Sequence, residues 1–173
     1  MGAKGTPATA AAARAKVEHR IHEYRHDPAA ASYGLEAAEQ LGVDPDDVFK
    51  TLVAEVDGRL AVAVVPVAAR LDLKALAAAA GGRRAVMAEP ADAERATGYV
   101  VGGISPLAHR KRLPVFLDSS MRDRPTVMVS AGRRGLELEL SPADLAHLST
   151  GTFAPLAAGE AAGGDRGAEP PES

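Results

Sequence analysis

The stretch VFKTLVAEVDGRLAVAVVPV (residues 48–67) decides the fold, because two apolar runs flank the dipeptide Asp57-Gly58. Such a dipeptide between apolar runs is the strongest short-range signal for a β-hairpin. The sequence therefore predicts paired strands over residues 48–56 and 60–67. Lys50 lies near the start of the first strand, where a lysine either reaches the edge of the sheet or points its charge into a pocket.

Shorter elements surround this hairpin in the sequence. Capping residues, glycines, prolines and apolar periodicity predict helices over residues 7–16, 34–41, 73–80, 91–96 and 142–148, and strands over residues 17–22, 85–87, 115–117, 126–130 and 136–140. Hairpins mixed with intervening helices predict an α+β domain. Beyond residue 151 the periodicity ends, so we expect one domain over residues 1–151 and a disordered tail over residues 152–173.

The composition narrows the class of protein. A chain of 173 residues, 46% of them hydrophobic, is long enough for one domain with a substantial core. The absence of cysteine excludes disulfides, thiolate metal sites and a cysteine nucleophile. The net charge of −3 argues against a protein that coats nucleic acid, although basic clusters at residues 83–84, 110–112 and 133–134 allow local phosphate contacts. The apolar runs are too short to span a membrane, and we expect a cytoplasmic protein.

A second stretch, TGYVVGGISP (residues 97–106), has the composition of a binding loop. Gly102 and Gly103 carry no Cβ atom, so the backbone there can approach a ligand closely, and Pro106 fixes the exit of the loop. Backbone N–H groups in such a loop can bind a carbonyl or phosphate oxygen. Taken alone, the pattern fits an ordinary glycine-rich turn better than a site.

Three histidines, His19, His22 and His26, raise the alternative of a metal site. The alternation of apolar and polar residues from Val17 predicts a strand through this segment. On a strand, His22 and His26 would lie roughly 13 Å apart, too far to share one ion. We therefore expect no metal, and we expect His26 and Asp27 to organise the turn before Pro28.

Two motifs together resemble the YbaK family of aminoacyl-tRNA deacylases, which are related to the editing domain of prolyl-tRNA synthetase. The motifs are Phe49-Lys50-Thr51-Leu52 and the stretch over residues 97–106. The resemblance covers about residues 6 to 150, with further matching segments at residues 6–8, 26–28, 33–39, 71–74 and 130–136. It implies a mixed, partly barrel-like β-sheet surrounded by short helices.

The resemblance also implies an activity. The substrate would be an amino acid esterified to the ribose of a tRNA end, most often cysteine on proline-specific tRNA. The cysteinyl thiol would attack its own ester carbon, releasing tRNA and a cyclic thiolactone, so the enzyme would be a carboxylic-ester hydrolase or a lyase that needs no cofactor. The implied partners are the aminoacyl-tRNA and prolyl-tRNA synthetase, and we expect a monomer.

The same resemblance assigns roles to individual residues. The backbone of Gly102, Gly103, Ile104 and Ser105 would bind the oxyanion and the terminal adenosine, and Lys50 would orient the substrate and counter negative charge. The remaining pocket residues would be Tyr24, Tyr33, Thr51, Pro106, Ser130, Gly132 and Glu137. For Tyr24 and Tyr33, a core aromatic with its hydroxyl in water is nearly as good an interpretation.

The sequence departs from the family pattern at three positions. Ala108 stands where relatives usually have glycine, His109 replaces a glutamine, and Glu137 replaces a frequent aspartate. The first two affect the loop that would hold the tRNA end, and the third affects the preference for one amino acid. Two alternatives to a cysteine-specific enzyme remain open, which are editing of alanine- or serine-charged tRNA and a non-catalytic module that binds the tRNA end.

Overall fold

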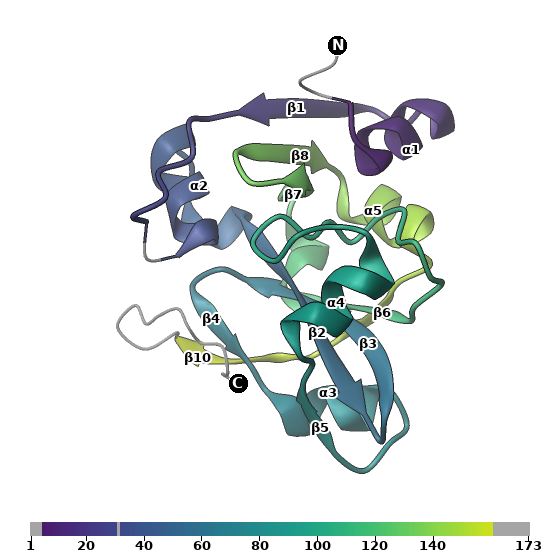
Figure 1. Cartoon of the computed structure of the whole chain (residues 1–173). Helices are drawn as coiled ribbons and strands as arrows, with labels where there is room; N and C mark the ends of the chain where they lie inside the picture. The colour runs from purple at the N-terminus through teal and green to yellow at the C-terminus, as the bar shows by residue number, and fades with distance from the viewer. Residues whose placement is uncertain (1–4, 31, 161–173) are drawn as a thin grey trace.

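The computed structural model describes residues 5–30 and 32–160, and its elements are arranged around the predicted hairpin (Figure 1). Strands β2 (Phe49–Val56) and β3 (Arg59–Pro66) pair in an antiparallel register that sets Val56 opposite Arg59. Asp57 and Gly58 form the turn with φ angles of 51° and 86°. Both angles lie in the left-handed region that a two-residue hairpin turn requires, and the hairpin prediction is confirmed.

The strands of the described residues form three sheets. The largest has the order β5-β2-β3-β6-β9, with β5 (Ala85–Met87), β6 (Val115–Asp118) and β9 (Thr152–Ala154). A three-stranded antiparallel sheet has the order β1-β8-β7, with β1 (His19–Glu23), β8 (Leu136–Leu140) and β7 (Val127–Arg133). A third pairs β10 (Ala157–Glu160) with β4 (Ala69–Leu71).

A parallel bridge between Val48 and Met128 joins the first two sheets along the seam between β2 and β7. This seam sets the start of β2, and therefore Lys50, beside the three-stranded sheet. The α+β class with a mixed sheet in a single domain is confirmed. The sheets of the described residues do not close into a barrel.

Helices lie where the capping signals predict them. They are α1 (Pro7–Ala15), α2 (Tyr33–Leu41), α3 (Leu73–Ala79), α4 (Pro90–Thr97) and α5 (Pro142–Ser149), with short 3-10 helices η2 (Pro45–Asp47) and η3 (Ser119–Asp123). Thr6 and Thr9 cap α1 reciprocally, because each side chain accepts the backbone N–H of the other. No helix in the described part of the chain is long and apolar enough to cross a membrane.

The core separates into clusters that use opposite faces of the same strands. Phe49 and Val53 of β2 pack with Val129 of β7 and Leu138 of β8 in the main cluster. Residues of the opposite face, Ala54 among them, pack against Leu76 of α3. A smaller cluster joins α2 to Val48, Val67 and Met128. This division determines on which side of the sheets each site residue lies.

The folded part of the chain extends beyond the predicted boundary at residue 151. Residues 152–160, expected to begin a disordered tail, contain β9 and β10. Leu156 between them is fully buried, and Asp118 Oδ1 accepts the N–H groups of Leu156 and Ala157 at 2.8 and 2.9 Å. Buried apolar contact and pairing with distant strands hold this segment, and neither produces a local periodicity. Residues 161–173 of the predicted tail lie outside the described residues.

Candidate active site

The stretch over residues 97–106 is a loop closed at its base by side-chain hydrogen bonds. It begins at Thr97, the last residue of α4, and Gly98 caps the end of that helix with φ 84°. The hydroxyl of Tyr99 donates to the carbonyl of Leu107 at 2.7 Å, so the two ends of the loop are held together. Burial raises the pKa of Tyr99 to about 12, which keeps this donor protonated. The loop is therefore held at its base before any ligand binds.

The loop packs directly on the turn between β7 and β8. A Cβ atom added to Gly103 would lie 2.7 Å from the Cα of Arg133 and 2.8 Å from the backbone nitrogen of Arg134. A Cβ atom on Gly102 would lie 2.7 Å from both Arg134 Nε and the ring of Tyr33, and Gly102 has φ +92°. Only glycine allows this approach, which brings two segments about thirty residues apart in sequence into one structure.

The backbone N–H groups of the loop are not equivalent. The N–H of Gly103 donates to the carbonyl of Val100 at 2.9 Å, and that of Val101 donates to the carboxylate of Glu94 at 2.8 Å. The N–H groups of Gly102, Ile104 and Ser105 have no hydrogen-bond acceptor among the described residues. Donors of this kind are what an oxyanion site needs, whereas Gly103 is engaged in the turn itself.

Four of the predicted pocket residues lie on one face of the sheets, opposite the main core. Ser130 pairs with Glu137, and Glu137 pairs with His22, across β7, β8 and β1. Tyr24 follows β1, and its N–H donates to the carbonyl of Gly135 in the β7–β8 turn. Val48 and Met128 form a parallel bridge, so the two chains run in the same direction from this point. Lys50 on β2 and Ser130 on β7 each lie two residues beyond the bridge. Lys50, Ser130, Glu137 and Tyr24 are thus brought to one region.

Glu137 carries the carboxyl of this group, and the pKa of that carboxyl is strongly raised. It is 7% exposed, and burial raises its pKa from 4.5 to about 8. The pKa of Tyr24 is raised to about 12, first by burial and then by the charge of Glu137. At neutral pH both groups are therefore protonated, and both can donate a hydrogen bond to a ligand.

Thr51 lies on the other face of β2. Side chains alternate along a strand, and Thr51 falls between Phe49 and Val53, which face the main core. Its Oγ1 is buried without a hydrogen-bond partner in the described residues. The structure thus separates Thr51 from Lys50, although they are adjacent in sequence.

The other predicted site residues lie in or beside the loop. Ser105 and Pro106 are buried, and Ser105 Oγ accepts the N–H of Leu107 at 3.3 Å. Gly132 has φ +114°, and its N–H donates to Ser130 Oγ at 3.1 Å. Tyr33 is 39% exposed at the start of α2, and its ring lies beneath the guanidinium of Arg134, 4.7 Å away.

The three positions that depart from the family pattern have definite surroundings. Ala108 is exposed and adopts φ 59°, a left-handed conformation in which glycine would be unstrained. His109 Nε2 lies 2.7 Å from the carbonyl of Ser105, so an imidazole donor stands where glutamine would offer an amide. Burial lowers the pKa of His109, and the neutral ring suffices for this bond.

Three contacts of the loop were not predicted. Arg134 was interpreted only as part of a basic cluster, yet its Nε and Nη2 both donate to the carbonyl of Val101. Glu94 and His109 hold two further backbone groups of the loop. The glycines around Arg134 were the only local signal, because the contact joins residues far apart in sequence.

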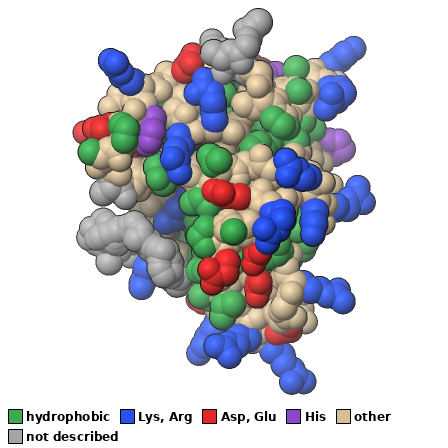
Figure 2. Space-filling model, in the orientation of Figure 1, with side chains coloured by type: hydrophobic (Ala, Val, Ile, Leu, Met, Phe, Trp, Pro, Cys, Tyr) green, Lys and Arg blue, Asp and Glu red, His purple; other side chains and the backbone are tan. Residues whose placement is uncertain are grey.

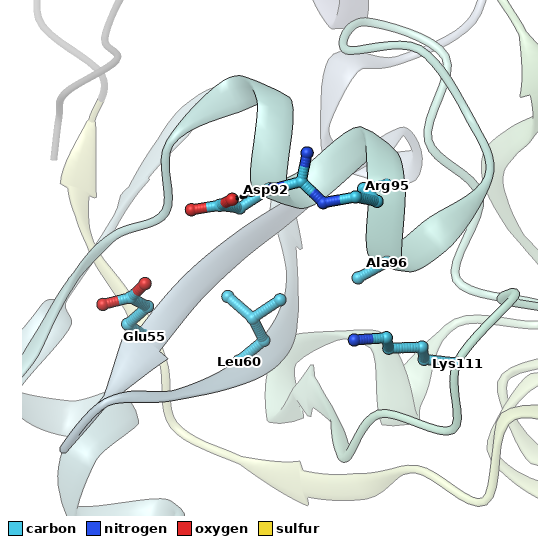
Figure 3. Close-up of a pocket in the computed structure, with 6 residues that line it drawn as sticks. All are labelled: Glu55, Leu60, Asp92, Arg95, Ala96 and Lys111. Atoms are coloured by element: carbon cyan, nitrogen blue, oxygen red, sulfur yellow. Dashed lines mark hydrogen bonds and ion pairs between the residues drawn. The ribbon is translucent and has the colours of Figure 1, made fainter.

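A separate hollow lies between α4 and the β2–β3 hairpin. Figure 3 shows Asp92, Arg95 and Ala96 of α4 on one wall, Glu55 and Leu60 of the hairpin on the other, and Lys111 at one end. Asp92 and Arg95 form an ion pair with each other. The hollow contains none of the predicted site residues.

Basic side chains are spread over the visible face rather than gathered in one patch (Figure 2).

The histidines weighed above as a metal site, His19, His22 and His26, do not share a common partner in the part of the chain that the structure describes; His22 and His26 contact different glutamates. His22 pairs with Glu139 at 2.8 Å, and His26 pairs with Glu36 at 2.9 Å. Among the described residues no group of three His, Cys, Asp or Glu side chains could hold a metal ion.

Comparison with known proteins identifies the family. The profile of the aminoacyl-tRNA editing domain matches residues 27–148. The chain is 35% identical over 161 residues to the Enterococcus faecalis protein named "Putative Cys-tRNA(Pro)/Cys-tRNA(Cys) deacylase EbsC", covering 90% of this chain and 98% of that one.

Solved structures agree with this result. One described as "a putative trans-editing enzyme for prolyl tRNA synthetase" is 25% identical, with a TM-score of 0.77 over 90% of this chain and 99% of that one. Another, of a hypothetical protein, is 24% identical with a TM-score of 0.78, covers 88% of this chain and 100% of the other, and supports the fold alone. The chain belongs to the aminoacyl-tRNA editing domain family.

Proposed function

We propose that the protein is a trans-editing deacylase that removes a mischarged amino acid from tRNA, with cysteine on proline-specific tRNA as the preferred substrate. The observation that carries the proposal is the glycine loop, whose Gly102, Ile104 and Ser105 N–H groups are without acceptors in the described residues. The loop rests on the turn that connects the strands of Ser130 and Glu137. Membership of the editing family and the name of the Enterococcus relative support the same substrate class.

The roles follow from the chemistry of an ester. Cleavage places negative charge on the carbonyl oxygen, and the free N–H groups of the loop bind that oxygen. Lys50 orients the ribose or a phosphate of the tRNA end and counters developing charge. Tyr24, Ser130, Gly132 and Glu137 line the pocket of the amino acid. The protonated carboxyl of Glu137 supplies a hydrogen-bond donor there, which a carboxylate could not.

The chemistry is assisted by the substrate. The sulfur of the cysteinyl side chain forms a bond to its own ester carbon, and the bond from that carbon to the ribose oxygen breaks. The thiol proton ends on the ribose oxygen, so the products are tRNA with a free hydroxyl and a cyclic thiolactone. The protein holds the thiol against the ester and stabilises the charge, which is a positioning task. In this scheme the step that frees the tRNA is a lyase reaction, because no water takes part in it. Water opens the thiolactone afterwards.

We also propose where the protein acts and with which partners. The chain acts as a cytoplasmic monomer on tRNA, and prolyl-tRNA synthetase supplies part of the tRNA selection. A net charge of −3 and scattered basic residues support this division of labour, because so little basic surface favours contact with only the end of the tRNA.

The test compares matched esters of one tRNA. Proline-specific tRNA is charged with cysteine and with serine, which differ only in sulfur against oxygen, and release is followed with purified protein. We expect rapid release of cysteine, slow release of serine and a transient thiolactone, whose acylated sulfur does not react with a thiol-reactive probe until water opens the ring. Equal rates for the two esters would refute thiol assistance, and failure to release any amino acid would leave a module that binds the tRNA end.

A further inference from the structure

We propose that Arg134 is a positioning residue that sets the direction of the Gly102 N–H group, an inference that rests on the proposed function. Arg134 lies in the turn between β7 and β8, and its side chain reaches the glycine loop. Its Nε and Nη2 donate to the carbonyl oxygen of Val101 at 3.1 and 2.5 Å. Two donors from one rigid planar fork fix the direction of that carbonyl more tightly than one donor could.

The carbonyl of Val101 and the N–H of Gly102 belong to the same peptide group. That group is planar and trans, so its C=O and N–H bonds point in opposite directions. Fixing the Val101 carbonyl toward Arg134 therefore turns the Gly102 N–H away from Arg134. This N–H is one of those without an acceptor among the described residues. Arg134 thus prepares an oxyanion donor without touching the substrate.

Surrounding contacts hold both the arginine and the peptide in place. The guanidinium of Arg134 stacks over the ring of Tyr33, 4.7 Å from its centroid. Glu94 accepts the N–H of Val101, which belongs to the preceding peptide group, at 2.8 Å, so both polar backbone groups of Val101 are bound by side chains. Gly102 leaves room for this arrangement, because an added Cβ would lie 2.7 Å from both Arg134 Nε and the Tyr33 ring.

The peptide would otherwise be free to rotate. Glycine adopts positive and negative φ with similar ease, and Gly102 with φ +92° follows the peptide that Arg134 holds. Without the guanidinium, the Val101 carbonyl loses both of its donors and gains the freedom to turn toward the site. A flipped peptide would present a carbonyl where the oxyanion needs a donor. The expected result is a slower chemical step with substrate affinity largely kept.

The experiment measures single-turnover release of cysteine from charged proline tRNA at saturating protein, for wild type, Arg134→Ala, Arg134→Lys and Arg133→Ala. We expect Arg134→Ala to lower the saturated rate by roughly tenfold to a hundredfold, which is less than the roughly hundredfold to thousandfold loss for removing an oxyanion donor, because the Gly102 N–H itself remains. Arg134→Lys should recover only part of the rate, because a single ammonium cannot reproduce the fork. Added methylguanidinium should partly rescue Arg134→Ala. Arg133→Ala removes an equal charge from the neighbouring residue at the end of β7, and we expect it to change affinity rather than the saturated rate.

A second readout does not depend on activity. The amide resonance of Gly102 should shift in Arg134→Ala and stay in place in Arg133→Ala, with both variants folded by circular dichroism. An active wild type with an unchanged saturated rate in Arg134→Ala would overturn the positioning role. An inactive wild type would refute the proposed function instead, and an unmoved Gly102 amide would then still overturn the inference about Arg134.

Discussion

Replacing Glu137 with glutamine should remove a large dependence of stability on pH. Glu137 is 7% exposed, and its pKa rises from 4.5 to about 8 through burial. One pKa unit corresponds to about 1.4 kcal/mol, so the ionised carboxylate costs the folded state up to roughly 5 kcal/mol. Glutamine has nearly the same shape as the protonated acid but does not titrate.

The sign follows from the order of the two pKa values. Below about pH 4.5 the carboxyl is protonated in both the folded and the unfolded chain, and the pH has no effect through this group. As the pH rises from 4.5 to 8, only the unfolded chain releases the proton, so wild type loses stability relative to Glu137→Gln. Above pH 8 the difference is complete.

The assay is urea unfolding of both proteins at pH 5, 7 and 9. Glu139→Gln is the matched control, because Glu139 lies two residues along the same strand and on the same face. The hydrogen bond from Thr126 and the contacts with His22 lower the pKa of Glu139. Its contribution is therefore present at neutral pH and lost as the pH falls, so the control should lose stability at pH 7. Parallel stability curves for wild type and Glu137→Gln from pH 5 to 9 would refute a protonated Glu137.

Three further substitutions test the structure. Gly103→Ala should destabilise the protein by about 1–3 kcal/mol and abolish deacylation, because the added Cβ would lie 2.7–2.8 Å from backbone atoms. An unchanged urea midpoint would argue against this packing. Ala108→Gly should raise stability by up to about 1 kcal/mol, because it relieves a left-handed alanine at φ 59°, and a lowered midpoint would contradict that strain. Asp118→Ala should lower the free energy of unfolding by about 3 kcal/mol or more, because it removes the acceptors for the N–H groups of Leu156, Ala157 and Ser120. A loss below about 1 kcal/mol in urea unfolding would show that other contacts hold β10.

Much of the fold could be predicted because its signals are local. The Asp57-Gly58 turn, the Thr6 cap and the glycine that ends α2 each act within a few residues. Strands β4, β9 and β10 were not predicted, since each is three or four residues long and depends on pairing with distant partners. Asp118, which binds the backbone at residues 156 and 157, gives no sign of this role in sequence.

The arrangement of the candidate site could be predicted in part for the same reason. The motif glycines and Lys50 follow from the resemblance, and strand alternation and pairing place Lys50, Ser130 and Glu137 on one face. The orientation of the loop could not be predicted, because it depends on the contact of Arg134 with Val101, 33 residues away. Which N–H groups of the loop already have an acceptor depends likewise on the turn that engages Gly103.

Release of amino acid from proline-specific tRNA tests most directly whether the protein is a deacylase that uses Lys50. The tRNA is charged separately with cysteine, alanine and proline, and wild type is compared with Lys50→Ala. Half-buried Lys50 lies at the start of β2, and we expect its truncation to change the melting temperature little. We expect rapid loss of cysteine, sparing of proline and collapse of the rate in a folded Lys50→Ala variant. Release of none of the three amino acids by wild type, or full activity in Lys50→Ala, would contradict this expectation.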